Sequence, residues 1–111
     1  MTATLDEREL ELRSLDGTPL WVRSVRPETA RAQLAFVHGF AEHGGRYQET
    51  LRWFAERGFN TAVIDLRGHG RSGGKRTFVR QWADYVDDVE AYLGHVAENS
   101  GELPTFLIGH S

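Results

Sequence analysis

The sequence predicts an α/β fold in which a β-hairpin precedes a parallel β-α-β-α-β unit. Short apolar runs of strand length alternate with segments whose apolar residues recur at helical spacing, which is typical of a parallel sheet with crossover helices. In front of them, two strand-like segments flank an Asp-Gly turn. With 111 residues, 40% hydrophobic and 26% charged, the chain has the length and composition of one globular domain.

The hairpin is predicted from residues 8–14 and 20–25. Residues 8–14 alternate charged and apolar side chains, so that Leu10 and Leu12 share one face of a strand. The Asp16-Gly17 pair provides the turn, and residues 20–25 are rich in strand-forming side chains.

Three apolar runs predict the parallel strands, at residues 34–37, 61–64 and 105–108. Because each run is uninterrupted by polar residues, we expect strands that are buried on both faces, the last one included. A helix over roughly residues 46–57 connects the first two strands, with Leu51 and Ala55 on its apolar stripe.

A second helix, from about Trp82 to residues 99–101, shows the clearest helical spacing of apolar residues. We interpret its aromatic residues as core packing against the sheet and its acidic residues as a mostly solvent-exposed face. The aromatic residues are Trp82, Tyr85 and Tyr92, and the acidic residues are Asp84, Asp87 and Asp88.

The loop after the second parallel strand, residues 65–74, is rich in glycine but matches no phosphate-binding pattern. It lacks the Lys-Ser/Thr ending of a P-loop and the Gly-x-Gly-x-x-Gly of a dinucleotide site. We therefore expect Asp65 and Arg67 to tie the strand end to neighbouring loops. Ser72 is not followed by the pattern of a nucleophile and is not a rival for that role.

The last predicted strand leads into Gly109-His110-Ser111, the first three residues of a Gly-x-Ser-x-Gly nucleophile elbow. In this motif a sharp turn after the strand exposes the serine hydroxyl above the sheet. We expect Ser111 to be the nucleophile, supported by Gly109 and His110; the alternative is an ordinary serine after a strand.

Residues 38–47, 65–74 and 109–111, each after a predicted strand, together resemble the N-terminal portion of an α/β-hydrolase. The Glu-His-Gly-Gly-Arg-Tyr segment at residues 42–47 resembles the monoacylglycerol lipase, lysophospholipase and serine aminopeptidase group. The resemblance implies that residues 1–111 are the incomplete N-terminal part of one hydrolase domain, ending at the elbow without cap or C-terminal strands.

The resemblance also implies an acyl-serine mechanism on carboxylic esters of the monoacylglycerol or lysophospholipid type. The N–H of Phe40 would donate to the oxyanion, Gly39 would allow close backbone approach, and His38 would brace the loop by hydrogen bonds. His43 would either line the substrate pocket or face solvent. Because the triad acid and histidine follow the serine in this fold, we expect the chain as given to be inactive alone.

Neither cofactor nor metal is expected, since His43 and His69 have no further ligand at a suitable spacing. A net charge of −3 favours neither nucleic acid nor an anionic membrane. No apolar run approaches the roughly 20 residues that span a bilayer. With no cysteine and a charged N-terminal segment, we expect a cytoplasmic protein whose partner is a small acyl ester, without stable membrane insertion.

Other functions stay open at this point. The protein could be a peptidase, thioesterase or non-haem peroxidase of the same fold, since the cap that selects the substrate follows the elbow. It could be a truncated remnant, one half of a split protein, or a non-catalytic binding module. In the chain as given, residues 106–108 would form an apolar edge, for which we expect low stability or self-association.

Overall fold

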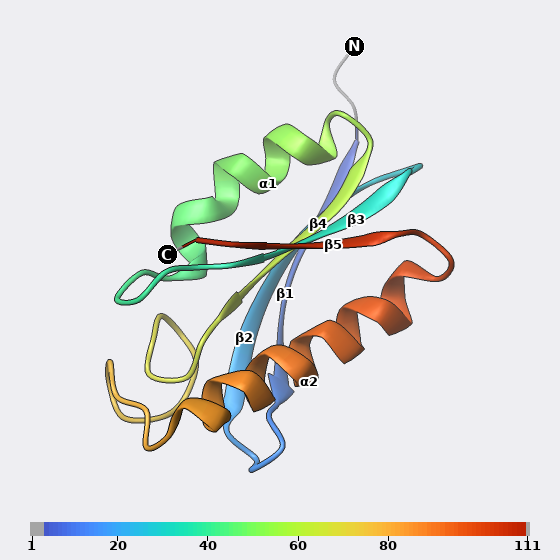
Figure 1. The fold of residues 1–111 in the computed structure, drawn as a ribbon. Helices are drawn as coiled ribbons and strands as arrows, with labels where there is room; N and C mark the ends of the chain where they lie inside the picture. Colours follow the sequence, from blue (N-terminus) through green and yellow to red (C-terminus); the bar gives the residue numbers. More distant parts are fainter. Residues whose placement is uncertain (1–3, 111) are drawn as a thin grey trace.

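The computed structural model describes residues 4–110. They form one five-stranded mixed sheet in the order β1-β2-β4-β3-β5 (Figure 1). The elements are β1 (Leu5–Arg13), β2 (Pro19–Pro27), β3 (Ala32–Val37), the 3-10 helix η1 (Gly44–Tyr47), α1 (Gln48–Ala55), β4 (Phe59–Asp65), α2 (Trp82–Ser100) and β5 (Thr105–Gly109). The predicted hairpin followed by β-α-β-α-β is confirmed. The predicted helix over 46–57 is divided into η1 and a shorter α1.

The strand pairing places the three sequence motifs at one edge of the sheet. β1 pairs antiparallel with β2, and β2 pairs antiparallel with β4. β3 lies between β4 and β5 and pairs parallel with both. Because the carboxyl ends of parallel strands meet at the same edge, the segments after β3, β4 and β5 converge there.

The two helices pack on opposite faces of the sheet. Leu51 and Ala55 of α1 lie in a core with Val63 of β4, and Tyr92 of α2 lies in a second core with Ile64 of the same strand. Tyr92 is fully buried, and its hydroxyl donates to the backbone oxygen of Phe36 at 3.2 Å. Within residues 4–110, neither helix has the length and apolarity of a membrane span.

Two predictions about α2 are wrong. Asp84 and Asp88 are buried, with exposed fractions of 5% and 0%, because both lie against Arg67 of the loop after β4. Trp82 is 74% exposed instead of packed in the core, because it begins the helix beyond the part of α2 that covers the sheet. The prediction of core packing holds for Tyr92.

Arg67 connects the hairpin turn to α2. Its guanidinium is 2.7 Å from Asp88 and 2.8 Å from Asp16, and the Ser14 hydroxyl donates to the same Asp88 carboxylate at 2.7 Å. Hydrogen bonds from Arg67 and then from Thr18 hold the pKa of the Asp16 carboxyl well below its usual range. The sequence-based expectation that Arg67 ties the loop to its neighbours is thereby confirmed.

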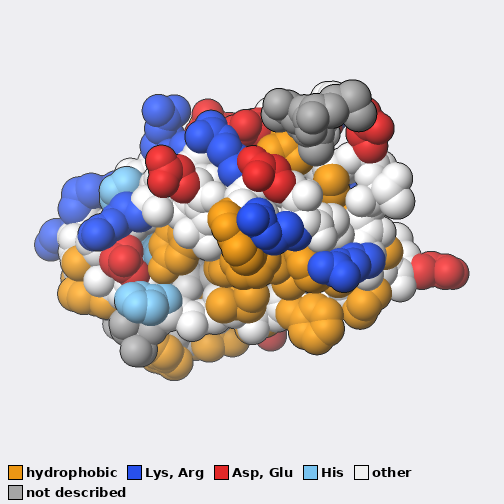
Figure 2. Space-filling model, turned by 90° about the horizontal axis from the view of Figure 1, so that it is seen from above, with side chains coloured by type: hydrophobic (Ala, Val, Ile, Leu, Met, Phe, Trp, Pro, Cys, Tyr) orange, Lys and Arg blue, Asp and Glu red, His pale blue; other side chains and the backbone are white. Residues whose placement is uncertain are grey.

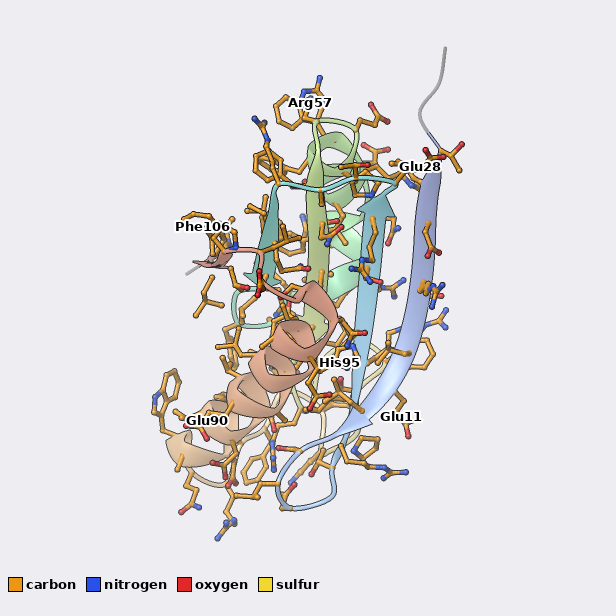
Figure 3. The ribbon with its side chains drawn as sticks, turned by 90° about the vertical axis from the view of Figure 1, so that its right-hand side faces the viewer. Glu11, Glu28, Arg57, Glu90, His95 and Phe106 are labelled. Carbon is orange, nitrogen blue, oxygen red and sulfur yellow. The ribbon has the colours of Figure 1, made fainter. Side chains whose placement is uncertain are left out.

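β5 is present. Its apolar run is typical of a strand buried on both faces, but in the chain as given it forms the exposed edge that we expect for residues 106–108. It is the last strand in the sheet order, and all of its residues are exposed, with Phe106 at 55% and Leu107 at 53%. Figure 3 shows Phe106 at the margin of the molecule, and Figure 2 shows hydrophobic side chains exposed on the face seen from above. The expected apolar edge therefore exists in the described part of the chain.

This edge predicts self-association of the 111-residue chain. An unpaired strand with apolar side chains is a template for pairing with a second copy. We expect Leu107→Lys to shift the chain toward monomer in sedimentation experiments, because a lysine on an edge strand opposes strand addition. Leu15→Lys is the matched control, since Leu15 is also exposed but lies in the hairpin turn. Equal behaviour of the two variants would contradict an association through β5.

The ion pair of Asp16 predicts a pH-dependent contribution to stability. Because the pKa of this carboxyl is lowered in the folded state, its stabilising effect is complete above the ordinary value of about 3.9 and fades as the pH falls below it. We expect Asp16→Asn to lower the free energy of unfolding by about 0.5–1 kcal/mol at pH 7, the upper range for a half-exposed pair, and by less at pH 3.

Chemical denaturation at pH 7, 5 and 3 measures this difference. Asp6→Asn is the control, because Asp6 lies on the exposed β1 and contacts Arg8 two residues away. A loss for Asp16→Asn that is the same at pH 7 and pH 3 would show that the charge of Asp16 does not matter.

Candidate active site

The segments after β3, β4 and β5 bring most of the predicted site residues together. The N–H of His110 donates to the backbone oxygen of Val37 at 3.1 Å, which aligns the end of β5 with the end of β3. Gly109 ends β5 opposite Val37 in the parallel ladder. Ser111 lies outside the described residues, so its role as nucleophile stays a prediction.

A tight turn follows β3. The N–H of Glu42 donates to the oxygen of Gly39 at 3.1 Å, and Ala41 has a φ of 65°. A positive φ at the third position of a hydrogen-bonded turn is typical of type II, where glycine is usual. An alanine in this conformation costs roughly 1–2 kcal/mol. The turn is therefore maintained by contacts from outside its own backbone.

Those contacts engage the backbone N–H groups on either side of Phe40. The Gly39 N–H donates to the Glu42 carboxylate at 2.8 Å, and the Ala41 N–H donates to Nε2 of His69 at 3.0 Å. Among residues 4–110, no acceptor lies within hydrogen-bonding distance and angle of the Phe40 N–H itself. Within the described residues this donor is therefore unpaired, which is compatible with the predicted oxyanion role.

Gly39 lies where a side chain would not fit. A β-carbon placed on it would be 2.8 Å from Oε1 of Glu42 and 3.1 Å from the backbone oxygen of His110. The turn after β3 and the segment after β5 therefore lie close together at Gly39. The role that the resemblance implies for Gly39 at the oxyanion stays a prediction.

Two buried histidines brace the turn. His38 and His69 have exposed fractions of 2% and 4%, and their ring centroids are 5.0 Å apart. Nδ1 of His38 lies 2.7 Å from the oxygen of Gly39, while its Nε2 accepts the Leu66 N–H at 3.0 Å. This pairing requires the Nδ1–H tautomer, and burial lowers the pKa of His38. These are the kind of hydrogen bonds that the bracing role expected for His38 requires.

His69 has the same arrangement, and the sequence analysis missed its role. Its Nδ1 lies 2.9 Å from the oxygen of Arg67, and its Nε2 accepts the Ala41 N–H. One ring thus connects the loop after β4 to the turn after β3. The sequence shows the Gly-His-Gly motif at residues 68–70, but it does not indicate that Ala41 on the other loop is the hydrogen-bond partner of His69.

His43 does not line the cavity described below, and of its two predicted locations the structure shows the solvent-facing one. Its side chain is exposed, and Nδ1 accepts the Gly45 N–H at 3.1 Å, which caps the start of η1. No three histidine, aspartate or glutamate side chains within residues 4–110 are grouped as metal ligands.

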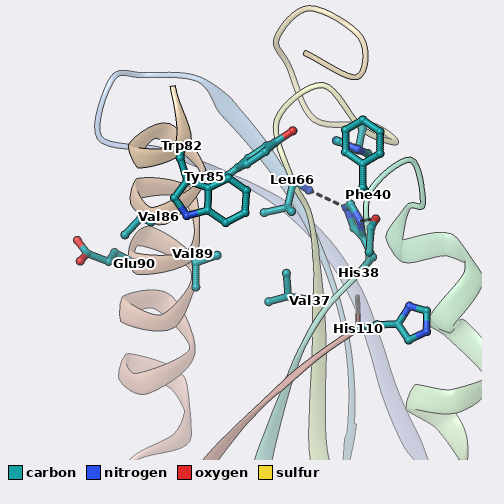
Figure 4. A pocket seen from close by; sticks show the side chains of 12 residues that line it. Val37, His38, Phe40, Leu66, Trp82, Tyr85, Val86, Val89, Glu90 and His110 are labelled. Carbon is teal, nitrogen blue, oxygen red and sulfur yellow. Dashed lines mark hydrogen bonds between the residues drawn. The ribbon is translucent and has the colours of Figure 1, made fainter. Parts of the chain in front are cut away.

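An open apolar cavity of about 500 Å³ lies beside the turn, between α2 and the sheet (Figure 4). Figure 4 shows Trp82 and Tyr85 reaching across from α2 toward Phe40. Both aromatic residues were assigned to the core from the sequence. Tyr85 is buried and also contributes to the cavity wall, whereas Trp82 lines the cavity and is largely exposed. The remaining apolar lining consists of Val37, Leu66, Val86 and Val89.

Asp65 joins the two loops that frame the site. It is 1% exposed, and its carboxylate accepts the N–H of Gly44, from the segment after β3, and the N–H of Arg71 at 2.9 Å. The buried Ser72 hydroxyl donates to the backbone oxygen of Asp65. The structural role predicted for Asp65 agrees with these contacts. The structural role of Ser72 was not predicted.

With this geometry in place, comparisons with known proteins identify the family. The sequence profile described as "Serine aminopeptidase, S33" matches residues 28–111. The chain belongs to this family of α/β-hydrolases. The match includes all three motif blocks that first suggested the resemblance, since it begins before residue 38 and ends at residue 111.

Relatives of this hydrolase chain include lipases and an esterase. It is 37% identical over 92 residues to a monoacylglycerol lipase of Mycolicibacterium smegmatis, covering 83% of this chain and 32% of the relative. It is 36% identical over 97 residues to the human monoglyceride lipase, covering 86% and 32%. A carboxyl esterase from Bacillus coagulans, solved with glycerol, superposes with a TM-score of 0.81 at 28% identity, covering 96% and 37%. The hydrolase chain thus spans about a third of these proteins' lengths.

The packing around Asp65 predicts that Gly70 cannot be replaced. A β-carbon on Gly70, which has a φ of +50°, would lie 2.3 Å from the Asp65 carboxylate. Gly17 also has a positive φ, +88°, but has no atom within 4 Å of that position. We expect Gly17→Ala to lower the free energy of unfolding by about 1 kcal/mol and Gly70→Ala by at least about 3 kcal/mol, measured by urea denaturation. Similar losses would mean that the Asp65 contact is unimportant.

Proposed function

We propose that this chain carries the nucleophile and one oxyanion donor of a serine hydrolase that cleaves carboxylic esters. The observation that carries the proposal is the Phe40 N–H. It has no acceptor among residues 4–110, while the N–H groups on both sides are held by Glu42 and His69. It also belongs to a turn that lies against His110, the residue before Ser111.

The reaction begins with attack of the Ser111 hydroxyl on the ester carbonyl. A base takes the hydroxyl proton, and the Phe40 N–H donates to the carbonyl oxygen as it becomes negative. The base then returns the proton to the departing alcohol, and water hydrolyses the resulting acyl-serine. Both ring nitrogens of His38 and His69 are already used in hydrogen bonds to the backbone. Because the acid and the histidine of the triad follow the serine in this fold, we place the base and its acid partner outside residues 1–111 and expect the chain alone to be inactive.

The substrate we propose is an ester of a medium or long acyl chain, such as a monoacylglycerol or lysophospholipid. The cavity of about 500 Å³ beside Phe40 is lined mainly by apolar side chains, which suits a hydrocarbon chain. The names of several relatives agree, including a monoacylglycerol lipase and a Bacillus subtilis phospholipase that is 31% identical over 80 residues. Residues 1–111 would then be one part of a single hydrolase domain.

Covalent labelling tests the proposal in the product of the complete natural reading frame. We expect a fluorophosphonate probe to label the wild type, and Ser111→Ala to abolish labelling and lower ester hydrolysis at least about 1000-fold, since removing a serine nucleophile costs even more in well-studied hydrolases. Ser100→Ala is the control, because this serine ends α2.

Each alternative function gives a different result. An unlabelled, folded wild type would support a non-catalytic remnant or a binding module and would contradict the proposal. Labelling at Ser111 with hydrolysis of peptides or thioesters, but not of acylglycerols, would retain the serine mechanism and overturn the substrate class.

A further inference from the structure

One carboxylate oxygen links three parts of the candidate site. Oε1 of Glu42 accepts the Gly39 N–H at 2.8 Å and the Tyr47 hydroxyl at 3.4 Å, and lies 3.0 Å from Nδ1 of His110. Gly39 belongs to the turn, Tyr47 to η1, and His110 to the segment after β5. The Glu42 side chain is only 22% exposed although it is charged.

Glu42 also holds Gly39 through its backbone. The Glu42 N–H donates to the oxygen of Gly39, the same oxygen that His38 Nδ1 approaches at 2.7 Å. That oxygen and the Phe40 N–H belong to one planar peptide unit, so fixing the carbonyl also fixes the direction of the N–H. Glu42 therefore restrains both ends of Gly39, one by its carboxylate and the other by its own backbone.

We propose that Glu42 is a positioning residue for the reaction, which aims the Phe40 N–H at the oxyanion and holds its turn against the segment that carries Ser111. This inference rests on the proposed function and adds to it a residue that need not touch the substrate. A carboxylate close to a developing negative charge would oppose catalysis if it were uncompensated. Here hydrogen bonds from the Gly39 N–H and from the His110 ring stabilise the carboxylate, and they are the main causes of the lowered pKa of Glu42.

Three substitutions of Glu42 separate the effect of the position of the acceptor oxygen from the effect of its charge. Glu42→Gln keeps an oxygen at the same distance from the backbone and removes the charge. Glu42→Asp keeps the charge and withdraws the oxygen by the length of one methylene, out of reach of Gly39 and His110 together. Glu42→Ala removes both. If position is what matters, glutamine preserves the rate and aspartate does not.

The test compares these three variants with the wild type, all made from the complete natural reading frame. Glu49→Ala is the matched control, since Glu49 is an exposed glutamate on α1. The readouts are kcat and KM for a p-nitrophenyl ester, with active sites counted by fluorophosphonate titration so that unfolded protein is excluded, and the melting temperature.

We expect Glu42→Ala and Glu42→Asp to lower kcat per titrated site roughly 10- to 100-fold with KM within about threefold, somewhat less than the loss of an entire oxyanion donor. Glu42→Gln and Glu49→Ala should stay within about threefold of the wild type. Should Glu42→Ala fail to fold, the contrast between aspartate and glutamine decides the question.

Two results overturn the inference. One is an unchanged kcat in Glu42→Asp, even with a lower melting temperature, which would make the contacts purely structural. The other is a loss in Glu42→Gln at least as large as the loss in Glu42→Asp, because it would show that the charge is required and that the position of the oxygen alone does not set the rate. A wild type that neither hydrolyses esters nor reacts with the fluorophosphonate is a different failure, because it would refute the proposed function itself.

Discussion

The buried ion pair of Arg67 and Asp88 is the interaction on which the geometry of this site depends. Arg67 is 8% exposed and Asp88 fully buried, and such charges are tolerated only when they are paired and hydrogen-bonded. The pair fixes the loop after β4 against α2. The backbone oxygen of Arg67 then orients His69, and His69 in turn accepts the Ala41 N–H. A continuous chain of contacts thus leads from the interior of the protein to the turn that contains Phe40.

The two sides of the site use different physical properties. Around the turn, hydrogen bonds between side chains and the backbone fix the orientation of the peptide groups. Across the cavity, Trp82, Tyr85 and Val86 of α2 offer apolar surface without directional contacts. Binding an ester of a long acyl chain requires both properties. The carbonyl group must be oriented by directional contacts, whereas the hydrocarbon chain need only be kept from water. This correspondence, rather than either side alone, supports the proposal of a lipid-like ester as substrate.

The parts of the structure that the sequence predicts are those set by local patterns. Periodicity in apolar residues located every strand and helix, and the Gly-x-Ser motif indicated where β5 ends. The errors concern burial, which depends on what packs from elsewhere in the chain. Asp84 and Asp88 look like a polar helix face until Arg67 is placed beside them. The apolar run of β5 looks like an interior strand, yet the sheet order puts it at the edge. The role of His69 depends on a backbone group 28 residues away, which no spacing rule reveals.

The strained residue Ala41 connects these observations to catalysis. A left-handed alanine is unfavourable, and such residues persist when their surroundings hold them in place. Here Nε2 of His69 accepts the Ala41 N–H, and the Glu42 N–H closes the turn. These hydrogen bonds offset the free-energy cost of the left-handed conformation when the protein folds. Relaxing Ala41 to a negative φ would rotate the peptide unit that contains its N–H and would break the bond to His69. These contacts therefore favour one conformation of the turn before any ligand binds. A donor oriented in advance stabilises the oxyanion without any rearrangement during the reaction, and this is the condition under which a single backbone N–H has a large effect on rate.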